Sequence, residues 1–319
     1  MKKFLSIVLI VVLLLSVFTG CASKSPSSEP SGDTDGKTYK IGFTVNDFND
    51  KWVSYVLDAV KVWDDQNDEV EVVLGNSQSD SQKQFAIVED WISQGFDAIC
   101  VKPVDLEATK AMAKACSAAN IPYVAIQQPI DEATARCIQN SIKTGESQMQ
   151  AVVDMLDGKG NVVILEGEPG TLVAMQRLEG NKNILAKYPE IKLEAVEVAN
   201  WQRDQAMKVM ENWIQAGIKI DAVVASNDEM AIGAMLALDA ANARGDVIIA
   251  GIDATPDALK LMKEGKLDLT MFADANKLGT ETLDLAFKLV KGEAAEDVII
   301  DDLLITPEEA DEYLALQGE

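Results

Sequence analysis

Short apolar runs alternate along the chain with longer stretches in which apolar residues recur at helical spacing. The apolar runs are rich in β-branched residues and nearly continuous, which is typical of strands buried on both faces of a parallel sheet. Strands are expected at Lys40–Val45, Val70–Leu74, Ala98–Val101, Tyr123–Ile126, Asn161–Leu165, Leu193–Val198, Ala222–Ala225, Val247–Ile252 and Leu269–Phe272. Helices are expected near Trp52–Gln66, Gln82–Gln94, Leu106–Ala119, Gly145–Leu156, Leu172–Lys187, Arg203–Ala216, Glu229–Arg244, Pro256–Lys263 and Leu278–Lys291. This alternation predicts the α/β class with doubly wound parallel sheets.

The strand–helix pattern runs in two similar halves, with a break near Asn140. Each half begins with an apolar strand and continues through several βα units, and residues 39–319 are enough for two domains with separate cores. In such sheets, ligands bind beyond the carboxyl ends of the strands. The residues that directly follow each strand are therefore the first candidates for a site.

Two of these strand ends carry side chains suited to hydroxyl groups. Gln127 and Gln128 follow the fourth strand, and paired amides can both donate and accept hydrogen bonds. Arg177 lies on the helix after the fifth strand, and its guanidinium offers a fork of donors for neighbouring oxygens. A polar turn before Pro129 and a solvated helix arginine are the structural alternatives.

Two tryptophans lie close to strand ends. Trp52 is placed on the first helical turn after the first strand, where core packing and ligand contact are equally reasonable. Trp201 stands directly before a helix and is less obviously a core residue than the other tryptophans. Those others sit within helical runs and are interpreted as packing residues: Trp63, Trp91 and Trp213.

Helix capping explains part of the same polar pattern. Asn49 is expected to cap the first helix, and Ser226 with Glu229 fits a capping box at the helix after the seventh strand. That arrangement would leave Asn227 free to point into a cleft. Asp253, at the end of the eighth strand, is expected either to cap a helix or to accept ligand hydroxyls.

The N-terminus has the features of an export signal. Two lysines precede an apolar run at residues 4–18, which is shorter than the roughly 20 residues of a membrane span, so residues 1–20 are interpreted as a signal peptide. The end of this segment resembles the lipobox of bacterial lipoproteins, which implies a lipid on Cys21; ordinary cleavage nearby is the alternative. Residues 21–38 are rich in Ser, Pro and Gly and are expected to form a flexible tether. The predicted location is the outer face of the cell membrane, or the periplasm of a two-membrane cell, with membrane contact through the lipid alone.

Composition excludes several classes of function. Acidic residues number 52 against 28 basic ones, for a net charge of −24, which disfavours nucleic acid as a partner. The sequence has no histidine, so His-dependent nucleophiles and His-ligated metals are excluded, and it has no Walker A or GxGxxG motif. We therefore expect no catalytic residue, no metal and no cofactor. The remaining cysteines are expected to be buried apolar side chains: Cys100, Cys116 and Cys137.

Two segments carry a family resemblance. Ala225–Ala234 and Gly251–Asp257 are similar to hallmark segments of the ribose-type sugar-binding proteins of ABC importers, in the type I periplasmic binding protein family. Asn120–Pro122 and the Gly170–Thr171 pair ahead of Arg177 agree with it, and the similarity runs from Lys40 onward.

The resemblance implies two α/β lobes that close by hinge bending around three chain crossings, near Asn140, Asp274 and Asp302. The implied boundaries are residues 39–140 with 274–302 for lobe 1, and residues 141–273 with 303–319 for lobe 2. It also implies a monomer that delivers a sugar or polyol to an ABC importer permease. Presentation of the ligand to a membrane receptor or sensor kinase is the alternative.

The resemblance also implies the binding residues. Trp52 and Trp201 would stack on the two faces of a sugar ring, and hydroxyls would be bound by Asp50, Gln127, Gln128, Arg177, Asn227, Asp253 and Asp274. Ribose binders carry Asp-Arg in place of Gln127-Gln128, and Asn in place of Asp50 and Lys102, so ribose itself is not carried over. A glycosidase in which Asp50, Asp253 or Asp274 supplies acid and base is the enzymatic alternative.

Overall fold

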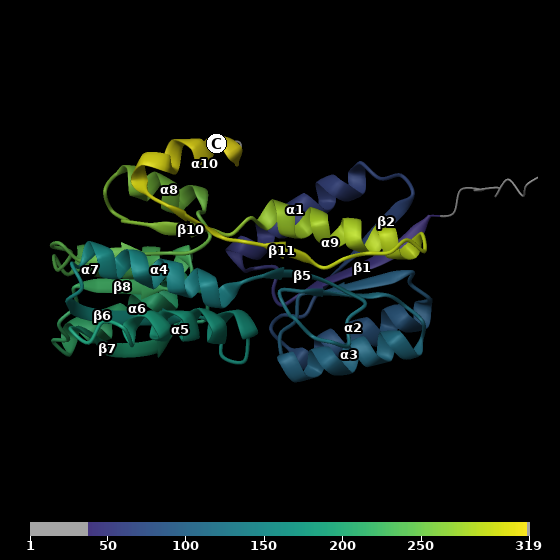
Figure 1. Ribbon diagram of the computed structural model, residues 1–319, viewed down its shortest axis with the longest axis horizontal. Helices are drawn as coiled ribbons and strands as arrows, with labels where there is room; N and C mark the ends of the chain where they lie inside the picture. The colour runs from purple at the N-terminus through teal and green to yellow at the C-terminus, as the bar shows by residue number, and fades with distance from the viewer. Residues whose placement is uncertain (1–37, 318–319) are drawn as a thin grey trace, which may run out of the picture. The chain divides into compact units, whose positions relative to one another are not determined.

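The computed structural model describes residues 38–317, in which strands and helices alternate (Figure 1). The predicted signal peptide, Cys21 and nearly all of the tether lie outside the described residues. The strands are β1 (Tyr39–Val45), β2 (Val70–Asn76), β3 (Ala98–Val101), β4 (Tyr123–Ile126), β5 (Ala135–Gln139), β6 (Gly160–Glu166), β7 (Ile191–Val198), β8 (Ala222–Ala225), β9 (Ile248–Ala250), β10 (Thr270–Phe272), β11 (Val298–Ile300) and β12 (Leu303–Ile305). The helices are α1 (Lys51–Asp65), α2 (Ser81–Gln94), α3 (Leu106–Ala118), α4 (Ser141–Met155), α5 (Leu172–Leu185), α6 (Arg203–Gln215), α7 (Asp228–Ala240), α8 (Pro256–Lys263), α9 (Ala275–Val290), the 3₁₀ turn η1 (Pro307–Glu309) and α10 (Ala310–Leu316).

The first lobe is built on a six-stranded parallel sheet with the order β11-β5-β4-β3-β1-β2. Helices α1 and α9 cover one face, and α2 and α3 cover the other (Figure 1). Alternate residues of β3 enter the two cores: Cys100 packs with the α1–α9 side, and Ile99 and Val101 pack with the α2–α3 side. Because both faces are buried, the strands are continuously apolar.

The second lobe is built on a four-stranded parallel sheet with the order β7-β6-β8-β9. Residues of β6 alternate between the α4–α5 side, which takes Ile164, and the α6–α7 side, which takes Leu165. A Cβ atom on Gly145 or Gly180 would overlap the backbone of the facing helix, so these two glycines let α4 and α5 approach closely. Arg177 lies in the part of α5 fixed by this contact.

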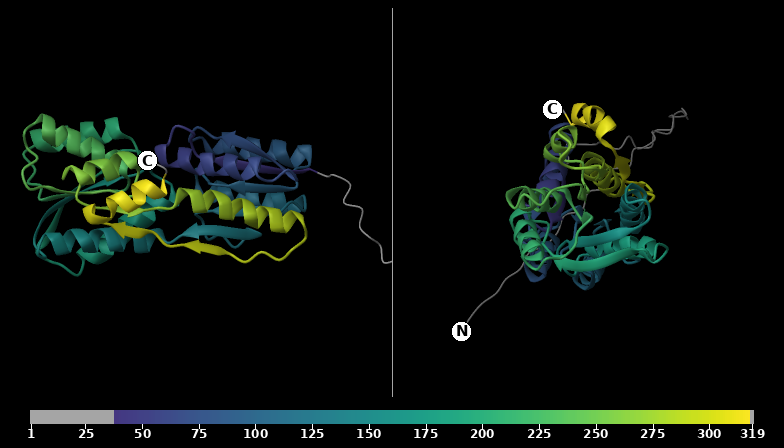
Figure 2. Two further views of the ribbon diagram at one scale, coloured as in Figure 1. Left: turned by 90° about the horizontal axis from the view of Figure 1, so that it is seen from above. Right: turned by 90° about the vertical axis from the view of Figure 1, so that its left-hand side faces the viewer.

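The C-terminal segment connects the two lobes. Strand β11 adds in parallel to β5, and β12 pairs antiparallel with β10; Figure 2 shows this segment, in yellow, running from one pairing to the other. The predicted strand at Leu269–Phe272 was expected in a parallel sheet: Leu269 does form an isolated parallel bridge with Ala250, whereas β10 pairs antiparallel with β12. The α/β class with parallel sheets and two lobes is confirmed, whereas the exact lobe boundaries stay a prediction.

Several local expectations need correction. Asp50, not Asn49, caps α1, because its carboxylate accepts from the backbone N–H of Val53. Asn227, not Ser226, caps α7. Helix α4 begins at Ser141 rather than near Gly145, and β5, β11, β12 and α10 were not predicted.

The expectation for three cysteines is confirmed. Cys100, Cys116 and Cys137 are buried and unpaired within the described part of the chain. None of the helices between residues 38 and 317 is long and apolar enough to cross a bilayer.

Candidate ligand-binding site

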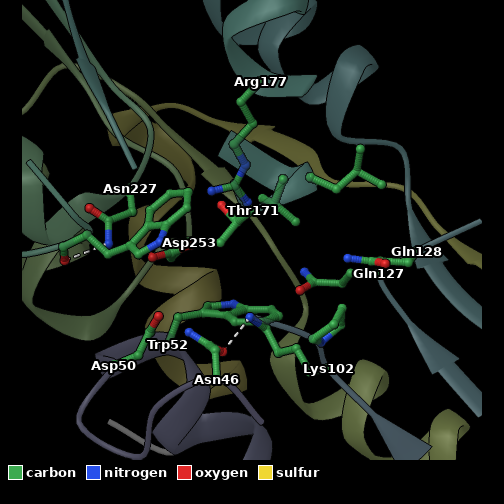
Figure 3. A pocket seen from close by; sticks show the side chains of 14 residues that line it. Asn46, Asp50, Trp52, Lys102, Gln127, Gln128, Thr171, Arg177, Asn227 and Asp253 are labelled. Atoms are coloured by element: carbon green, nitrogen blue, oxygen red, sulfur yellow. Dashed lines mark hydrogen bonds between the residues drawn. The ribbon is translucent and has the colours of Figure 1, made fainter. Parts of the chain in front are cut away.

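A cavity lies at the carboxyl ends of strands from both sheets (Figure 3). Its walls come from loops after β1, β3, β4, β7, β8 and β9, from the first turn of α1 and from the N-terminal half of α5. The structure brings together all of the predicted binding residues except Asp274: Asp50, Trp52, Gln127, Gln128, Arg177, Trp201, Asn227 and Asp253.

Trp52 belongs both to the core and to the cavity wall. Its side chain is 8% exposed and packs in the α1–α9 core. The indole Nε1 donates to the backbone carbonyl of Ala273 over 2.8 Å, which fixes the ring plane. Trp52 is therefore both a core residue and a residue of the cavity wall, and its contact with a ligand stays a prediction.

Trp201 is held in place by three neighbours. Its backbone is left-handed, with φ of 65°, and the side-chain amide of Asn227 donates to its carbonyl over 3.1 Å. A Cβ atom on Gly167 would overlap the indole, so only glycine at that position leaves room for the ring. The guanidinium carbon of Arg177 lies 5.9 Å from the ring centroid, within the range of a cation–π contact.

The Asp50 and Asn227 side chains cap helices at the cavity wall. Asp50 Oδ1 accepts from Val53 N over 3.1 Å, and Asn227 Oδ1 accepts from Met230 N over 2.9 Å. Capping fixes both side chains at the first turns of α1 and α7. The residues therefore enter the cavity already oriented, which lowers the entropy lost on binding.

Three buried atoms of the cavity lining lack a hydrogen-bond partner among residues 38–317. They are Gln127 Oε1, Gln128 Oε1 and Arg177 Nε, on side chains that are 6%, 3% and 4% exposed. The Arg177 guanidinium also donates through another nitrogen to the carbonyl of Ser226. Buried polar atoms are normally paired, so the lining offers two acceptors and one donor to a ligand.

Charged groups of both signs line the cavity. Burial raises the pKa of Asp253 well above its ordinary value, the Asp228 carboxylate adds to that shift, and the Arg177 guanidinium opposes it. Burial lowers the pKa of Lys102, against the attraction of Asp50. The Lys102 ammonium donates to Asn46 Oδ1 over 2.8 Å (Figure 3).

Asp274 does not line this cavity. It caps α9 by accepting from Lys277 N over 2.9 Å, and it lines an adjoining hollow that shares Trp52 and Asp253 with the cavity. The prediction missed a further set of lining residues: Asn46, Lys102, Pro103, Thr171, Leu172 and Val173. Asn46 and Lys102 directly follow β1 and β3, so both agree with the strand-end rule although neither was named as a binding residue.

A wider hollow adjoins the cavity and shares Asn46, Asp50 and Trp201 with it. Along this hollow, Ser79 Oγ donates to Glu168 Oε2 over 3.2 Å. The bond joins the loop after β2 to the loop after β6, and so it links the two lobes at the margin of the cavity. Burial raises the pKa of Glu168, and the Ser79 hydroxyl opposes that shift.

Comparison with known sequences assigns this architecture to a family. Residues 41–294 match the family described as periplasmic binding protein domain. The chain is 38% identical over 265 residues to a putative rhizopine-binding protein of Rhizobium meliloti, covering 80% of this chain and 86% of that protein. It is 34% identical over 284 residues to a xylitol-binding protein of Mycolicibacterium smegmatis, covering 87% of this chain and 79% of that protein.

A solved structure agrees with the sequence relatives. An ABC transporter solute-binding protein from Bacillus halodurans, with bound myo-inositol, superimposes with a TM-score of 0.86 at 39% identity. The match covers 88% of this chain and 99% of the other.

Proposed function

The chain belongs to the periplasmic binding protein family, and from that membership we propose that it captures a neutral polyhydroxylated ring and delivers it to the permease of an ABC importer. The ligand class is a monosaccharide or cyclic polyol. Related proteins are solute-binding proteins rather than enzymes, so the proposed activity is binding and release without chemical conversion.

The unpaired polar atoms of the cavity carry this proposal. Gln127 Oε1 and Gln128 Oε1 require donors, and Arg177 Nε requires an acceptor. A hydroxyl supplies both roles, so a ring with several hydroxyls satisfies all three atoms. The C–H faces of such a ring are suited to the indoles of Trp52 and Trp201, which line the same cavity.

Charge balance favours a neutral ligand. The lining contains two acidic side chains, Asp50 and Asp253, and two basic ones, Lys102 and Arg177. An anion or a cation would bring an unbalanced charge into a partly desolvated space, which is costly. The first probe is myo-inositol, since the protein 39% identical to this chain binds it. Xylitol, an open-chain polyol, is the second probe and tests whether a ring is required.

The proposed location is outside the cytoplasm, held by a lipid on Cys21 after removal of residues 1–20. Support comes from the lysines, the apolar run and the lipobox-like residues before Cys21. We further propose that the protein acts as a monomer, with the cavity formed by one chain. Asp274 stays among the proposed contacts only as a residue of the chain crossing next to the site.

Thermal unfolding with a ligand panel tests the proposed function. The panel contains myo-inositol, xylitol, ribose, glucose, an amino acid and a nucleoside. A ligand at 100 times its Kd stabilises the folded state by about 2.7 kcal/mol, so a cyclic polyol or sugar is expected to raise Tm by a few degrees. A response to the amino acid or nucleoside alone would overturn the ligand class.

The variant Gln128→Leu tests the contribution of one unpaired cavity atom. Its side-chain oxygen has no partner within residues 38–317, so this change preserves stability while removing an acceptor from the cavity. The Tm of the unliganded variant is expected to equal or exceed that of the wild type, with a smaller ligand-induced shift.

A further inference from the structure

A line of hydrogen bonds runs from the cavity to the last connection between the lobes. Gln127 Nε2, at the end of β4, donates to Gln139 Oε1 on β5. Gln139 Nε2 donates to Asp302 Oδ1 over 2.9 Å, and Asp302 Oδ2 accepts from Thr144 Oγ1 over 2.7 Å. Asp302 lies between β11 and β12, and Thr144 lies on α4.

The direction of these bonds is determined by Asp302. An ionised carboxylate only accepts hydrogen bonds, so Gln139 must turn its NH₂ group toward Asp302. The Gln139 oxygen then faces Gln127, which must donate a hydrogen bond through its own NH₂ group. The oxygen of Gln127 is consequently left without a partner among the described residues, on a buried side chain that lines the cavity.

The net shift in the pKa of Asp302 is upward, so the direction of the bonds rests on the two donors that face its carboxyl oxygens, Gln139 Nε2 and Thr144 Oγ1. Burial raises the pKa of Asp302, but the Arg177 guanidinium and the donors on Thr144 and Gln139 act in the opposite sense. A neutral hydrogen-bonding group at position 302 would permit either orientation of Gln139. The carboxylate permits one.

We propose that Asp302 and Gln139 are positioning residues that hold Gln127 as a hydrogen-bond acceptor toward the ligand. The inference rests on the proposed function and deepens it, because it identifies how the site selects a hydroxyl donor at one position of the ring. Selectivity at Gln127 is thus set by a carboxyl group that does not line the cavity.

The orientation of Gln127 is tested first without ligand, by NMR of the side-chain amides after ¹⁵N-glutamine labelling. Asp302→Asn and Gln139→Leu are expected to shift the Gln127 amide resonances. The matched control is Asp301→Asn, which removes the same charge from the adjacent, exposed residue, whose carboxylate pairs with Lys143 over 3.1 Å. Gln127 resonances unchanged in both test variants would overturn the proposal.

Binding of myo-inositol and its monodeoxy analogues, measured by calorimetry, tests the consequence. In the wild type, the analogue that lacks the hydroxyl facing Gln127 is expected to bind about tenfold more weakly, the usual effect of one lost buried hydrogen bond. In Gln139→Leu, the affinity for myo-inositol falls and this ratio approaches one, which a merely destabilised fold would not produce.

The possible outcomes separate the two proposals. A wild type that binds neither polyols nor sugars would overturn the proposed function. The amide resonances would still test the orientation of Gln127 in that case. A Gln139→Leu variant that keeps the wild-type ratio would overturn the positioning role alone.

Discussion

The indole of Trp52 donates to the backbone carbonyl of Ala273, 221 residues further along the chain. This bond ties the first turn of α1 to the loop between β10 and α9. The residue that forms part of the cavity wall therefore also anchors one of the segments that connect the lobes. Its hydrogen bond and its ring are expected to have separable effects.

Trp52→Phe keeps an aromatic ring and removes the indole donor. We expect a loss of about 1–2 kcal/mol in the free energy of unfolding, because the Ala273 carbonyl loses its buried donor. The affinity for myo-inositol is expected to fall by about tenfold at most, because the ring is smaller and no longer fixed. Urea unfolding and calorimetry measure the two quantities.

Trp63→Phe is the matched control for Trp52→Phe. Trp63 lies on the same helix, and its Nε1 donates to Asp284 Oδ1 over 2.8 Å, away from the cavity lining. A similar loss of stability is expected with unchanged affinity. Equal losses of affinity in both variants would contradict a role for Trp52 in ligand binding.

Trp201→Ala is expected to weaken binding at least tenfold and to leave the fold intact. The indole is partly exposed at the cavity, so its removal deletes ligand contact with a limited effect on the core. Trp213→Ala is the contrasting variant, since Trp213 is 5% exposed within the α6–α7 core and should cost about 3–5 kcal/mol of stability. Unchanged affinity in Trp201→Ala would contradict the proposed site.

The titration of Asp228 makes the free energy of unfolding depend on pH. It is fully buried and accepts from Thr255 N and Thr270 Oγ1, and burial raises its pKa to about 7. An unfolded aspartate loses its proton near pH 4, so between about pH 4 and 7 the native state binds more protons than the unfolded state. This group's contribution to stability is therefore present at low pH and is lost as the pH rises through that range.

Asp228→Asn is expected to flatten that slope. The variant cannot titrate at position 228, and it removes the charge that helps to raise the pKa of Asp253. Lost hydrogen bonds lower stability equally at every pH, so only the slope reports the titration. Urea unfolding between pH 4 and 8 compares the two proteins, and parallel curves would disprove the assignment.

Cys21→Ser tests the lipid anchor. The hydroxyl cannot take the thioether-linked lipid, so the protein is expected to appear in the medium or the periplasm instead of the membrane fraction. Fractionation followed by immunoblotting measures the distribution. Retention of the variant in the membrane would refute the anchor.

The sequence predicted the strands correctly where the apolar pattern was strong. The prediction failed where a strand pairs with a segment far away in the sequence. Strands β1, β3, β4 and β8 are apolar on both faces and stand out in the sequence. Strand β5 reads ARCIQ, and its edge neighbour β11 has only three residues. Their pairing, from Cys137 to Val298, depends on contacts across 161 residues that no local pattern reveals.

The site was predictable because parallel strands end at one edge of each sheet. What the sequence could not decide was which of two adjacent polar residues would cap a helix. Ser226 and Asn227 both suit that role, and the choice of Asn227 depends on its second bond, to the Trp201 carbonyl. Asp274 failed as a cavity residue for a related reason, since its carboxylate is used to cap α9.

The hydrogen bond between Ser79 and Glu168 affects how long the loops after β2 and β6 stay in contact. One hydroxyl-to-carboxylate bond between two loops contributes about 1 kcal/mol and can break without disturbing either core. It therefore acts mainly on how long the loops stay together after the ligand enters, a factor of about five in dwell time. Because a bond of this strength breaks readily, it is expected to prolong the contact between the two loops without blocking release of a ligand.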